Sequence, residues 1–452
     1  MTADPRTIVA ESGMTATQIV AVALIFGLNA LDGFDVLAIS FASPGIAAEW
    51  GIDRAALGIV LSMELIGMAL GSIFLGGVAD RVGRRPTILA CLTVMTTGMF
   101  LTATASSIAA LSAWRILTGL GIGGMLAALT AAVAEHSNNR NRHLCVALAA
   151  IGYPMGAVIG GSVAAMLLKT HDWRAVFLFG GTVTALFIPL MLWGLPETIA
   201  FLVRKRPKGA LEKINRTFAR MGHEPVTALP PEEIAERKYS VRDILRPGLI
   251  GTTLILTLAY FLHIATFYFI LKWIPKIVAD MGFDPSAAAG VLVWANVGGC
   301  AGGATLGFLA RFLPVKWLTI GVLLGSTVMV SIFGMGQSNL TGLALAAAIA
   351  GVFTNAGVVG FYAIFTQAFP THVRATGTGF AIGIGRGGAA IAPMIPGFLF
   401  SAGYSLQAVA IFMSMGALTA AITLSFLRER KSAFEGGQQK DNSHAHPLPR
   451  SL

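Results

Sequence analysis

The stretch AALGIVLSMELIGMALGSIFLGGVADRVGRRP, residues 55–86, decides the fold class. It begins with a long apolar run that contains one charged residue, Glu64, and it ends in a cluster of charged residues at 80–85. A helix over the apolar run is long enough to cross a hydrocarbon layer of about 30 Å. Basic residues directly after such a run favour the membrane surface. The stretch therefore predicts a membrane-spanning helix followed by a charged loop.

The composition extends this prediction to the whole chain. Of 452 residues, 55% are hydrophobic and only 12% are charged, which is too apolar for an ordinary soluble core. The 53 glycines suit closely packed membrane helices. The net charge of +10 comes from basic residues in particular loops rather than in one patch, so nucleic acid is not expected as a partner. Three cysteines, in or beside apolar runs, are interpreted as free and metal is not expected: Cys91, Cys145 and Cys300.

Twelve apolar runs indicate an all-α polytopic membrane protein. The first run is too long for a signal-peptide core and is expected to remain as a helix. The predicted spans lie near 17–41, 55–78, 87–107, 110–134, 144–168, 173–195, 249–271, 285–309, 315–336, 339–368, 376–400 and 404–427. Loops rich in Lys and Arg alternate with poorer ones, which places both termini in the cytoplasm and the chain in the inner membrane.

The chain divides into two six-helix halves. The sequence from Gly51, GIDRAALGIVLSMELIGMALGS, is similar to the sequence from Gly282, GFDPSAAAGVLVWANVGGCAGG. Glu135 with Arg142 has a counterpart in Gln367 with Arg374. Such a duplication predicts a substrate site between the halves near mid-membrane. The expected divisions are a cytoplasmic segment 1–16, a half 17–195, a linker 196–248, a half 249–427 and a disordered tail 428–452.

The linker contains an amphipathic pattern. Leu202, Leu211, Ile214 and Phe218 recur at helical spacing among basic residues, which predicts a helix lying against the membrane surface.

Several motifs resemble those of the major facilitator superfamily. The sequence GGVADRVGRRP at 76–86 is similar to its hallmark loop, and LPETIAFLVRKRPKGALEKI at 195–214 is similar to the segment that closes its first half. The copy of the hallmark loop in the second half, GFLARFLPVKW at 307–317, departs from the pattern because only Arg311 remains of the usual acidic–basic pair. The resemblance covers the chain from end to end and implies the two-half fold of that superfamily.

Finer motifs are similar to those of the aromatic acid:proton symporter family. They are LDGFD at 31–35, RILTGLGIGG at 115–124, KWIPKIVADMGF at 272–283 and FPTHVRATGTGFAIGIGRGGAAIAP at 369–393. The resemblance implies proton-driven uptake of acids such as hydroxybenzoates, protocatechuate or phenylpropanoid acids, with no cofactor. It gives functional weight to Asp32, Asp35, Arg115, Arg374 and Arg386.

An acidic stripe lies on the first helix. Asn29, Asp32 and Asp35 follow one another at spacings of three and share a face. A charged residue at mid-span costs roughly 2.5–3.5 kcal/mol on insertion scales, so the stripe must face an interior cavity. Burial disfavours a charged carboxylate, which suits Asp32 and Asp35 to carry the coupled proton. The alternative is a fixed ion pair that holds the first helix in register.

Three basic residues lie in or directly beside predicted membrane spans, and each has two interpretations. Arg115 is either a clamp for the substrate carboxylate or the partner of Asp35. Arg386 either pairs with Glu64 between the halves in one state or binds the substrate carboxylate. Lys272 either extends to the membrane surface or collects anions at the mouth of the cavity.

The remaining candidates are aromatic or lie at the cytoplasmic side. His263 either relays protons and binds a phenol or is held by packing and one hydrogen bond. Rings that could stack on the substrate are Phe34, Tyr260, Phe267, Tyr268, Phe361 and Tyr362. Residues expected to form a cytoplasmic gate, or else to anchor that face, are Asp80, Arg81, Arg84, Arg85, Glu135, Arg142 and Arg374.

These observations predict a monomeric transporter that imports an aromatic carboxylate with protons by alternating access between two sides of the lipid bilayer. The alternatives are another organic anion or a proton-driven exporter on the same fold. A membrane sensor is disfavoured because no signalling domain is present, and an enzyme because no nucleotide loop, metal cluster or nucleophile–base set appears.

Overall fold

Long apolar runs form long helices because a backbone away from water must satisfy its own hydrogen bonds. The computed structural model describes residues 4–231, 240–370 and 372–427, and its regular structure there is entirely helical. Within this described part, twelve helical segments are long and apolar enough to cross a membrane. Large apolar side chains such as Ile73 and Trp193 remain exposed on the outside of the bundle, where lipid would cover them. The prediction of a twelve-helix polytopic protein is confirmed.

The first half contains six spans, of which the second consists of α3 and the short α4 together. Its helices are α2 (Ala16–Trp50), α3 (Arg54–Leu75), α4 (Val78–Val82), α5 (Arg84–Ala103), α6 (Ile108–His136), α7 (Arg142–Leu167) and α8 (Arg174–Gly194).

The second half also contains six spans, and its fifth span is divided into α16 and α17. Its helices are α12 (Ile250–Asp280), α13 (Pro285–Leu309), α14 (Val315–Gly334), α15 (Leu340–Ala368), α16 (Arg374–Ile391), α17 (Met394–Ser401) and α18 (Leu406–Ser425). The remaining short helices lie outside the spans: α1 (Pro5–Glu11), α9 (Ile199–Lys205), α10 (Ala210–Met221) and α11 (Val241–Ile244).

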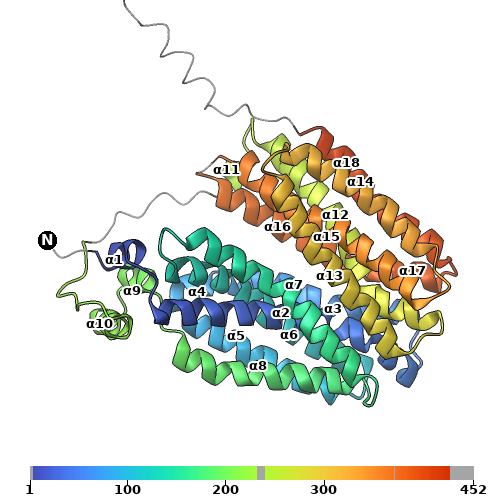
Figure 1. Cartoon of the computed structure of the whole chain (residues 1–452), viewed down its shortest axis with the longest axis horizontal. Coiled ribbons are helices and arrows are strands. Elements are labelled where there is room, and N and C mark those ends of the chain that lie inside the picture. Colours follow the sequence, from blue (N-terminus) through green and yellow to red (C-terminus); the bar gives the residue numbers. More distant parts are fainter. Residues whose placement is uncertain (1–3, 232–239, 371, 428–452) are drawn as a thin grey trace, which may run out of the picture.

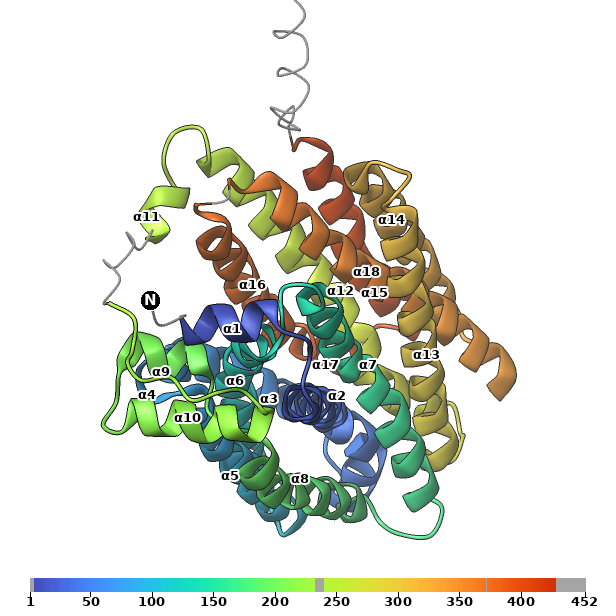
Figure 2. The same cartoon turned by 60° about the vertical axis from the view of Figure 1, so that its left-hand side comes forward.

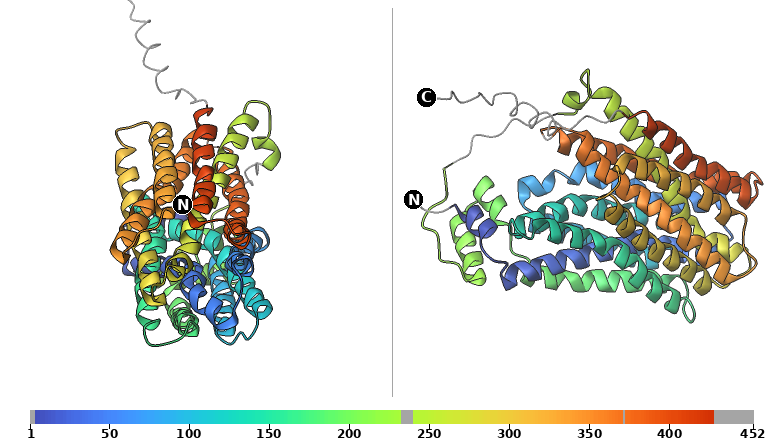
Figure 3. Two further views of the ribbon diagram at one scale, coloured as in Figure 1. Left: turned by 90° about the vertical axis from the view of Figure 1, so that its right-hand side faces the viewer. Right: turned by 45° about the horizontal axis from the view of Figure 1, so that its top comes forward.

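The two halves lie side by side. Figure 1 shows α2 to α8 in blue to green on one side and α12 to α18 in yellow to red on the other. The same separation is visible from the end in Figure 3, where most of the yellow-to-red half lies above the blue-to-green half. Helices α2, α3 and α7 of the first half contact α12, α13, α16 and α17 of the second. The interface between the halves is therefore built from these seven helices.

The first span is longer than predicted. Helix α2 continues through Pro44 to Trp50 and ends at Gly51, which has a left-handed backbone with φ of 60°. The sequence prediction ended this span at residue 41 because the residues that follow are small and less apolar. Phe41 and Ile46 of this extension are fully buried in one core with Trp173 and Phe177, which lie at the start of α8. This packing keeps the extension helical.

Close approach of α2 and α7 fixes how the acidic stripe is oriented. A Cβ atom on Gly33 would collide with the carbonyl oxygen of Tyr153, and one on Gly156 would collide with that of Ala30. Glycine at these positions lets two backbones touch, as is typical of membrane helices. The contact fixes the rotation of α2 about its axis.

The apolar face of the amphipathic linker packs on protein, whereas the sequence predicted that this face would lie against the membrane surface. Ile214 and Phe218 of α10 are fully buried, and they pack with Val9 of α1 and with Phe201 and Leu202 of α9. Figure 2 shows α1 beside α9 and α10 at one end of the molecule. The apolar face of α10 is therefore covered by protein, because α1 and α9 supply enough apolar surface to bury it. This end, marked by α1, α9 and α10, is called the linker end below.

Some predictions concern residues outside the described ranges. The predicted tail 428–452 and residues 232–239 of the predicted linker lie outside them, as do residues 1–3 of the N-terminal segment.

Replacing Gly33 with Leu should destabilise the protein by about 3 kcal/mol, since the new side chain collides with the backbone of α7, which has no room to retreat. The measurements are the monodisperse fraction after detergent extraction and the thermal unfolding midpoint.

The matched control is Gly290→Leu on α13, because no atom lies within 4 Å of a Cβ there. Equal midpoints and yields for the two variants would show that the α2–α7 contact does not limit stability.

Candidate functional site

The acidic stripe of α2 faces the interior, as the sequence predicted. Asp32 is 2% exposed and Asp35 is fully buried. Neither carboxyl oxygen of Asp35 accepts a hydrogen bond, and Oδ1 of Asp32 also has no partner. Asn29 is half-buried and donates only to the Ile25 carbonyl oxygen of its own helix, at 3.3 Å. Two buried carboxyl groups without donors are costly in their charged form.

A shared ion pair lies beside this stripe. The carboxylate of Glu64 on α3 binds Arg115 Nη2 of α6 through one oxygen, and its other oxygen lies 3.5 Å from Lys272 Nζ of α12. All three side chains are fully buried. Glu64 and Arg115 belong to the first half and Lys272 to the second. A single carboxylate therefore compensates one cation from each half.

Arg115 has further partners on both terminal nitrogens, although its buried Nε has none. Its Nη2 also donates to the carbonyl oxygen of Asp35 at 3.0 Å, and its Nη1 contacts Met99 Sδ at 3.2 Å. Its guanidinium lies 5.3 Å from the ring centre of Phe177. The expected pairing of Arg115 with the Asp35 side chain is absent, because Glu64 takes the guanidinium and Asp35 offers only its backbone.

Lys272 corrects a second prediction. It does not extend to the surface, because it is fully buried and donates to the Val36 carbonyl oxygen on α2. The long lysine chain reaches across the interface instead of outward, since an unmatched carbonyl and a carboxylate lie there. The predicted Glu64–Arg386 pair is also absent in this structure, and Lys272 and Arg115 occupy Glu64 in its place.

Arg386 is the least constrained of the interior cations. It is partly exposed, and its Nη1 donates to the Met68 carbonyl oxygen across the interface at 3.3 Å. It is also close enough to Asp32 on α2 and to Tyr268 on α12 to act on both electrostatically. Arg386 thus keeps capacity to bind an anion, unlike Arg115.

Aromatic side chains gather near Arg386. Tyr268 packs edge-to-face on Phe267 with ring centres 5.3 Å apart, and both Tyr268 and Tyr153 of α7 pack against the same buried core. The hydroxyls of Tyr260 and Tyr362 lie 3.4 Å apart. Tyr153 was missed by the sequence analysis, although it is the one aromatic residue in the glycine-rich run AAIGYPMGAVIGG at 149–161. The structure therefore surrounds the Arg386 region with phenol groups from both halves.

Two other candidate substrate-binding rings, those of His263 and Phe34, are packed against the protein itself. His263 is fully buried, its Nε2 lies 2.9 Å from the Thr354 carbonyl oxygen, and its ring stacks on Phe361. This is the packed arrangement given as the alternative for His263. Phe34 is 3% exposed and packs edge-to-face against Phe179 of its own half. Neither ring has a free face for a substrate.

The predicted gate residues lie at the linker end, but those that form ion pairs do so within the first half and the adjoining linker. Arg84 binds Glu135 at 2.9 Å and Asp80 at 3.0 Å, and Asp80 also binds Arg204 of α9. Arg85 donates to the Leu192 carbonyl oxygen, and Arg81 and Arg142 are exposed. Arg374 donates to the Phe369 carbonyl oxygen within its own half at 3.4 Å. In the described part of the chain, none of these ion pairs joins the two halves.

Glu197 is a site residue that the sequence analysis missed. Its carboxylate accepts the backbone N–H groups of Arg84 at 3.0 Å and Arg85 at 3.3 Å, at the start of α5. Burial raises the pKa of Glu197 above its usual value, and the hydrogen bonds partly oppose this effect. A signal was present, since an acidic residue beside the charged loop can cap a helix N-terminus. Glu197 ties the start of the linker to the hallmark loop.

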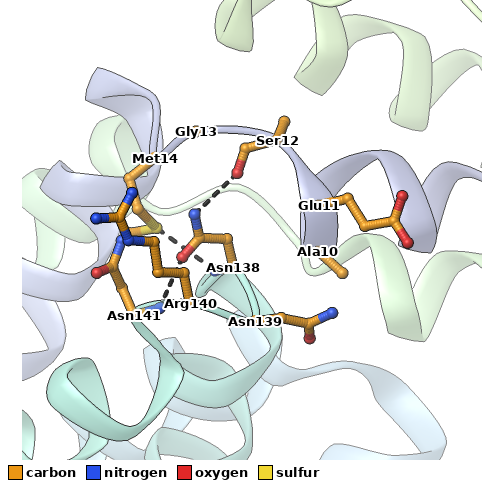
Figure 4. A pocket seen from close by; sticks show the side chains of 9 residues that line it. All are labelled: Ala10, Glu11, Ser12, Gly13, Met14, Asn138, Asn139, Arg140 and Asn141. Atoms are coloured by element: carbon orange, nitrogen blue, oxygen red, sulfur yellow. Dashed lines mark hydrogen bonds between the residues drawn. The ribbon is translucent and has the colours of Figure 1, made fainter.

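A hollow of about 530 Å³ lies at the linker end. Figure 4 shows its lining, in which Asn138 reaches the segment after α1. The Asn138 amide donates to the Ser12 carbonyl oxygen at 2.8 Å, and the Asn139 N–H donates to Ala10 at 2.8 Å. None of the predicted substrate or proton residues lines it. The hollow marks the joint between the N-terminal segment and the α6–α7 loop.

Comparison with known proteins places this architecture in one family. A family model described as Major Facilitator Superfamily matches residues 25–338 and 256–451. The chain is 30% identical to a gallate transporter of Pseudomonas putida over 91% of this chain and 92% of that protein. It is 31% identical to the 4-hydroxybenzoate transporter PcaK of the same organism, over 90% and 91%. The inward-open structure of the Escherichia coli xylose transporter XylE superposes with a TM-score of 0.70 at 16% identity, covering 92% of this chain and 97% of that one.

Replacing Glu64 with Gln should destabilise the protein by about 3–5 kcal/mol, because Arg115 and Lys272 would then be buried without their carboxylate. The measurement is thermal unfolding in detergent. Adding Lys272→Gln should recover part of the loss, since one unmatched cation is removed.

The control is Glu224→Gln, an exposed residue of the linker, which should leave the midpoint unchanged. A Glu64→Gln midpoint equal to that of the control would show that the shared ion pair contributes nothing to stability.

Proposed function

The chain belongs to the major facilitator superfamily, and we propose that it carries an aromatic carboxylic acid across the membrane together with protons. It is a multi-pass membrane transporter rather than an enzyme, as the sequence predicted. The proposed substrate class is supported by two relatives named for gallate and 4-hydroxybenzoate at about the same identity over nearly the whole chain. The observation that supports proton coupling is that Asp32 and Asp35 of α2 are buried and have carboxyl oxygens without hydrogen-bond partners.

The proton is proposed to reside on Asp32 or Asp35. A carboxyl group in a dry interior without donors readily exchanges its charge for a proton when conditions change around it. Asp32 has the better access, since it lies near Arg386 and retains some exposure, whereas Asp35 is sealed behind Arg115. A proton arriving at Asp32 would leave Arg386 with unbalanced positive charge. That charge favours the arrival of an anion.

The substrate carboxylate is proposed to bind Arg386. Arg115 is fully buried and already engaged by Glu64, by the Asp35 carbonyl group and by Phe177, so a ligand could reach its one unpartnered donor, Nε, only after the surrounding side chains move. Arg386, by contrast, donates one long hydrogen bond, to the Met68 carbonyl oxygen. The phenol groups of Tyr153 and Tyr268 and the ring of Phe267 lie on the helices that flank this position, and they suit a hydroxylated aromatic ring.

Alternating access is proposed as the transport cycle, with one chain sufficient for it. The linker end carries the basic hallmark loop and the linker, so it is proposed to face the cytoplasm with both termini, in the inner membrane. The opposite end is called the outer end below. The two-half arrangement and an ion pair that crosses the interface support a rocking motion about the central site.

Uptake into proteoliposomes tests the proposal. We expect labelled 4-hydroxybenzoate, protocatechuate or gallate to accumulate only with an inward proton gradient. Asp32→Asn should abolish gradient-driven accumulation, because the amide cannot take up or release the proton. The control Glu224→Gln removes an exposed carboxylate and should transport normally.

No accumulation of any aromatic acid by folded protein would overturn the substrate class. Accumulation of a non-aromatic anion, or uptake only when the proton gradient is reversed, would instead favour another anion or export.

Arg386→Gln should weaken substrate binding by about tenfold to a hundredfold, the range expected when a charge-assisted hydrogen bond is lost. The measurement is the KM for uptake, or Kd by scintillation proximity. Arg386→Lys should lose less, because it keeps the charge. An unchanged KM in Arg386→Gln would exclude this residue as the carboxylate site.

A further inference from the structure

The interior ionisable groups form a closed set. In the described part of the spans, the carboxyl groups away from both membrane ends are those of Asp32, Asp35 and Glu64, and the cations at the same depth are Arg115, Lys272 and Arg386. The remaining basic side chain at this depth is the weakly basic His263, whose ring contacts Thr354 and Phe361. With all three carboxyl groups ionised and His263 neutral, the charge of this set is zero.

Lys272 is the member whose ion pair crosses between the halves, whereas Arg386 crosses only with a hydrogen bond to the Met68 carbonyl oxygen. Lys272 comes from α12 of the second half and ends at Glu64 and the Val36 carbonyl oxygen of the first. Arg115 and Glu64 are both in the first half, so their ion pair does not itself depend on contact between the halves. Closing the outer end therefore changes the surroundings of Lys272 more than those of any other member of the set.

A dry seal covers Lys272 from the outer end. Arg54 of α3 binds Asp280 of α12 at 2.9 Å, and the Ala55 N–H donates to the Ser401 hydroxyl at 2.9 Å. Between them, α3 and α17 touch so closely that a Cβ atom on Gly58 would lie 2.7 Å from the Pro393 carbonyl oxygen. Lys272 is fully buried beneath these contacts. Each closure of the outer end must enclose its charge away from water.

Enclosing an unbalanced charge in such an interior costs several kcal/mol, so closure is favoured only when the interior is neutral. The empty interior with all three carboxyl groups ionised satisfies this condition, because Arg386 lies close enough to Asp32, and Arg115 close enough to Asp35, to offset their negative charges. So does an interior holding one monovalent carboxylate and one proton. A proton alone leaves one surplus positive charge, and an anion alone leaves one surplus negative charge. Both half-loaded states are penalised.

We propose that Lys272 fixes the coupling ratio at one proton per monovalent aromatic carboxylate, by completing a charge set that is neutral only in the empty and the doubly loaded states. The inference rests on the proposed proton symport. It makes the transport cycle electroneutral and makes proton leak without substrate unfavourable. Lys272 acts as a positioning charge and does not touch the substrate.

Imposing a membrane potential on native protein tests the ratio without any mutation. Proteoliposomes loaded with K⁺ and treated with valinomycin receive an inside-negative potential at fixed inward proton gradient, and accumulation of 4-hydroxybenzoate is measured. An electroneutral cycle should change by less than about twofold. A cycle that moves one net positive charge would gain roughly fifty-fold per 100 mV. Potential-driven accumulation would overturn the inference, whereas no uptake at all would count against the proposed function itself.

Variants of Lys272 test its role in the set. Lys272→Met leaves the empty interior with one surplus negative charge, so one carboxyl group must stay protonated through the cycle. We expect the pH profile of uptake to shift toward acid, with a loss of about tenfold at neutral pH. Lys272→Met combined with Asp35→Asn restores neutrality, keeps the Glu64–Arg115 pair and leaves Asp32, the more accessible carboxyl group, to carry the proton, so uptake at neutral pH should recover.

The matched control is Lys276→Met, one turn further along α12. Lys276 pairs with Asp280 of its own helix at the outer end and does not belong to the interior set. Its pH profile should equal that of the native protein. If Lys272→Met behaves like this control, or if Asp35→Asn deepens its defect instead of relieving it, Lys272 does not set the charge balance.

Discussion

The negative charge of Glu64 compensates buried positive charges from both halves of the molecule. It sits in a region from which water is excluded, and it neutralises Arg115 from its own half and Lys272 from the other. Without it, two cations would remain buried with only carbonyl oxygens as partners. The arrangement of α2, α3, α6 and α12 at this level follows from satisfying that one group. The unpartnered Asp35 side chain is a consequence, because Arg115 has already been used.

The two ends of the protein differ in how the halves are joined. At the outer end, an ion pair, a hydrogen bond and a close glycine contact connect α3 with α12 and α17. At the linker end, the ion pairs of Asp80, Arg84 and Glu135 remain within the first half and the adjoining linker. The hallmark loop and the linker form a rigid unit there, since Glu197 caps α5 and α10 packs on α1 and α9. Such a unit suits a half that moves as one body.

The sequence identified the charged residues that are energetically unfavourable inside the membrane, but it gave less information about their partners. Asp32, Asp35, Glu64, Arg115 and Arg386 stood out because a charge inside an apolar run is expensive wherever it points. Depth along a helix could be counted, but rotation and crossing angle could not. For that reason Arg115 was expected to bind either Asp35 or the substrate, and Lys272 to reach either the surface or the mouth of the cavity, whereas both meet at Glu64. Tyr153 passed unnoticed because aromatic residues are common in spans, and only its contact with Tyr268 distinguishes it.

Hydropathy, loop charge and internal duplication determined by themselves that the chain crosses the membrane twelve times in two similar halves. They are local properties, since each apolar run must form a helix to satisfy its own backbone. The family motifs are likewise contiguous in sequence. The tertiary structure alone decided that α10 is covered by protein, that Arg115 is used internally while Arg386 is not, and that Lys272 crosses the interface. These facts depend on side chains brought together from helices far apart in the chain, and a contact between them has no signature in either segment alone.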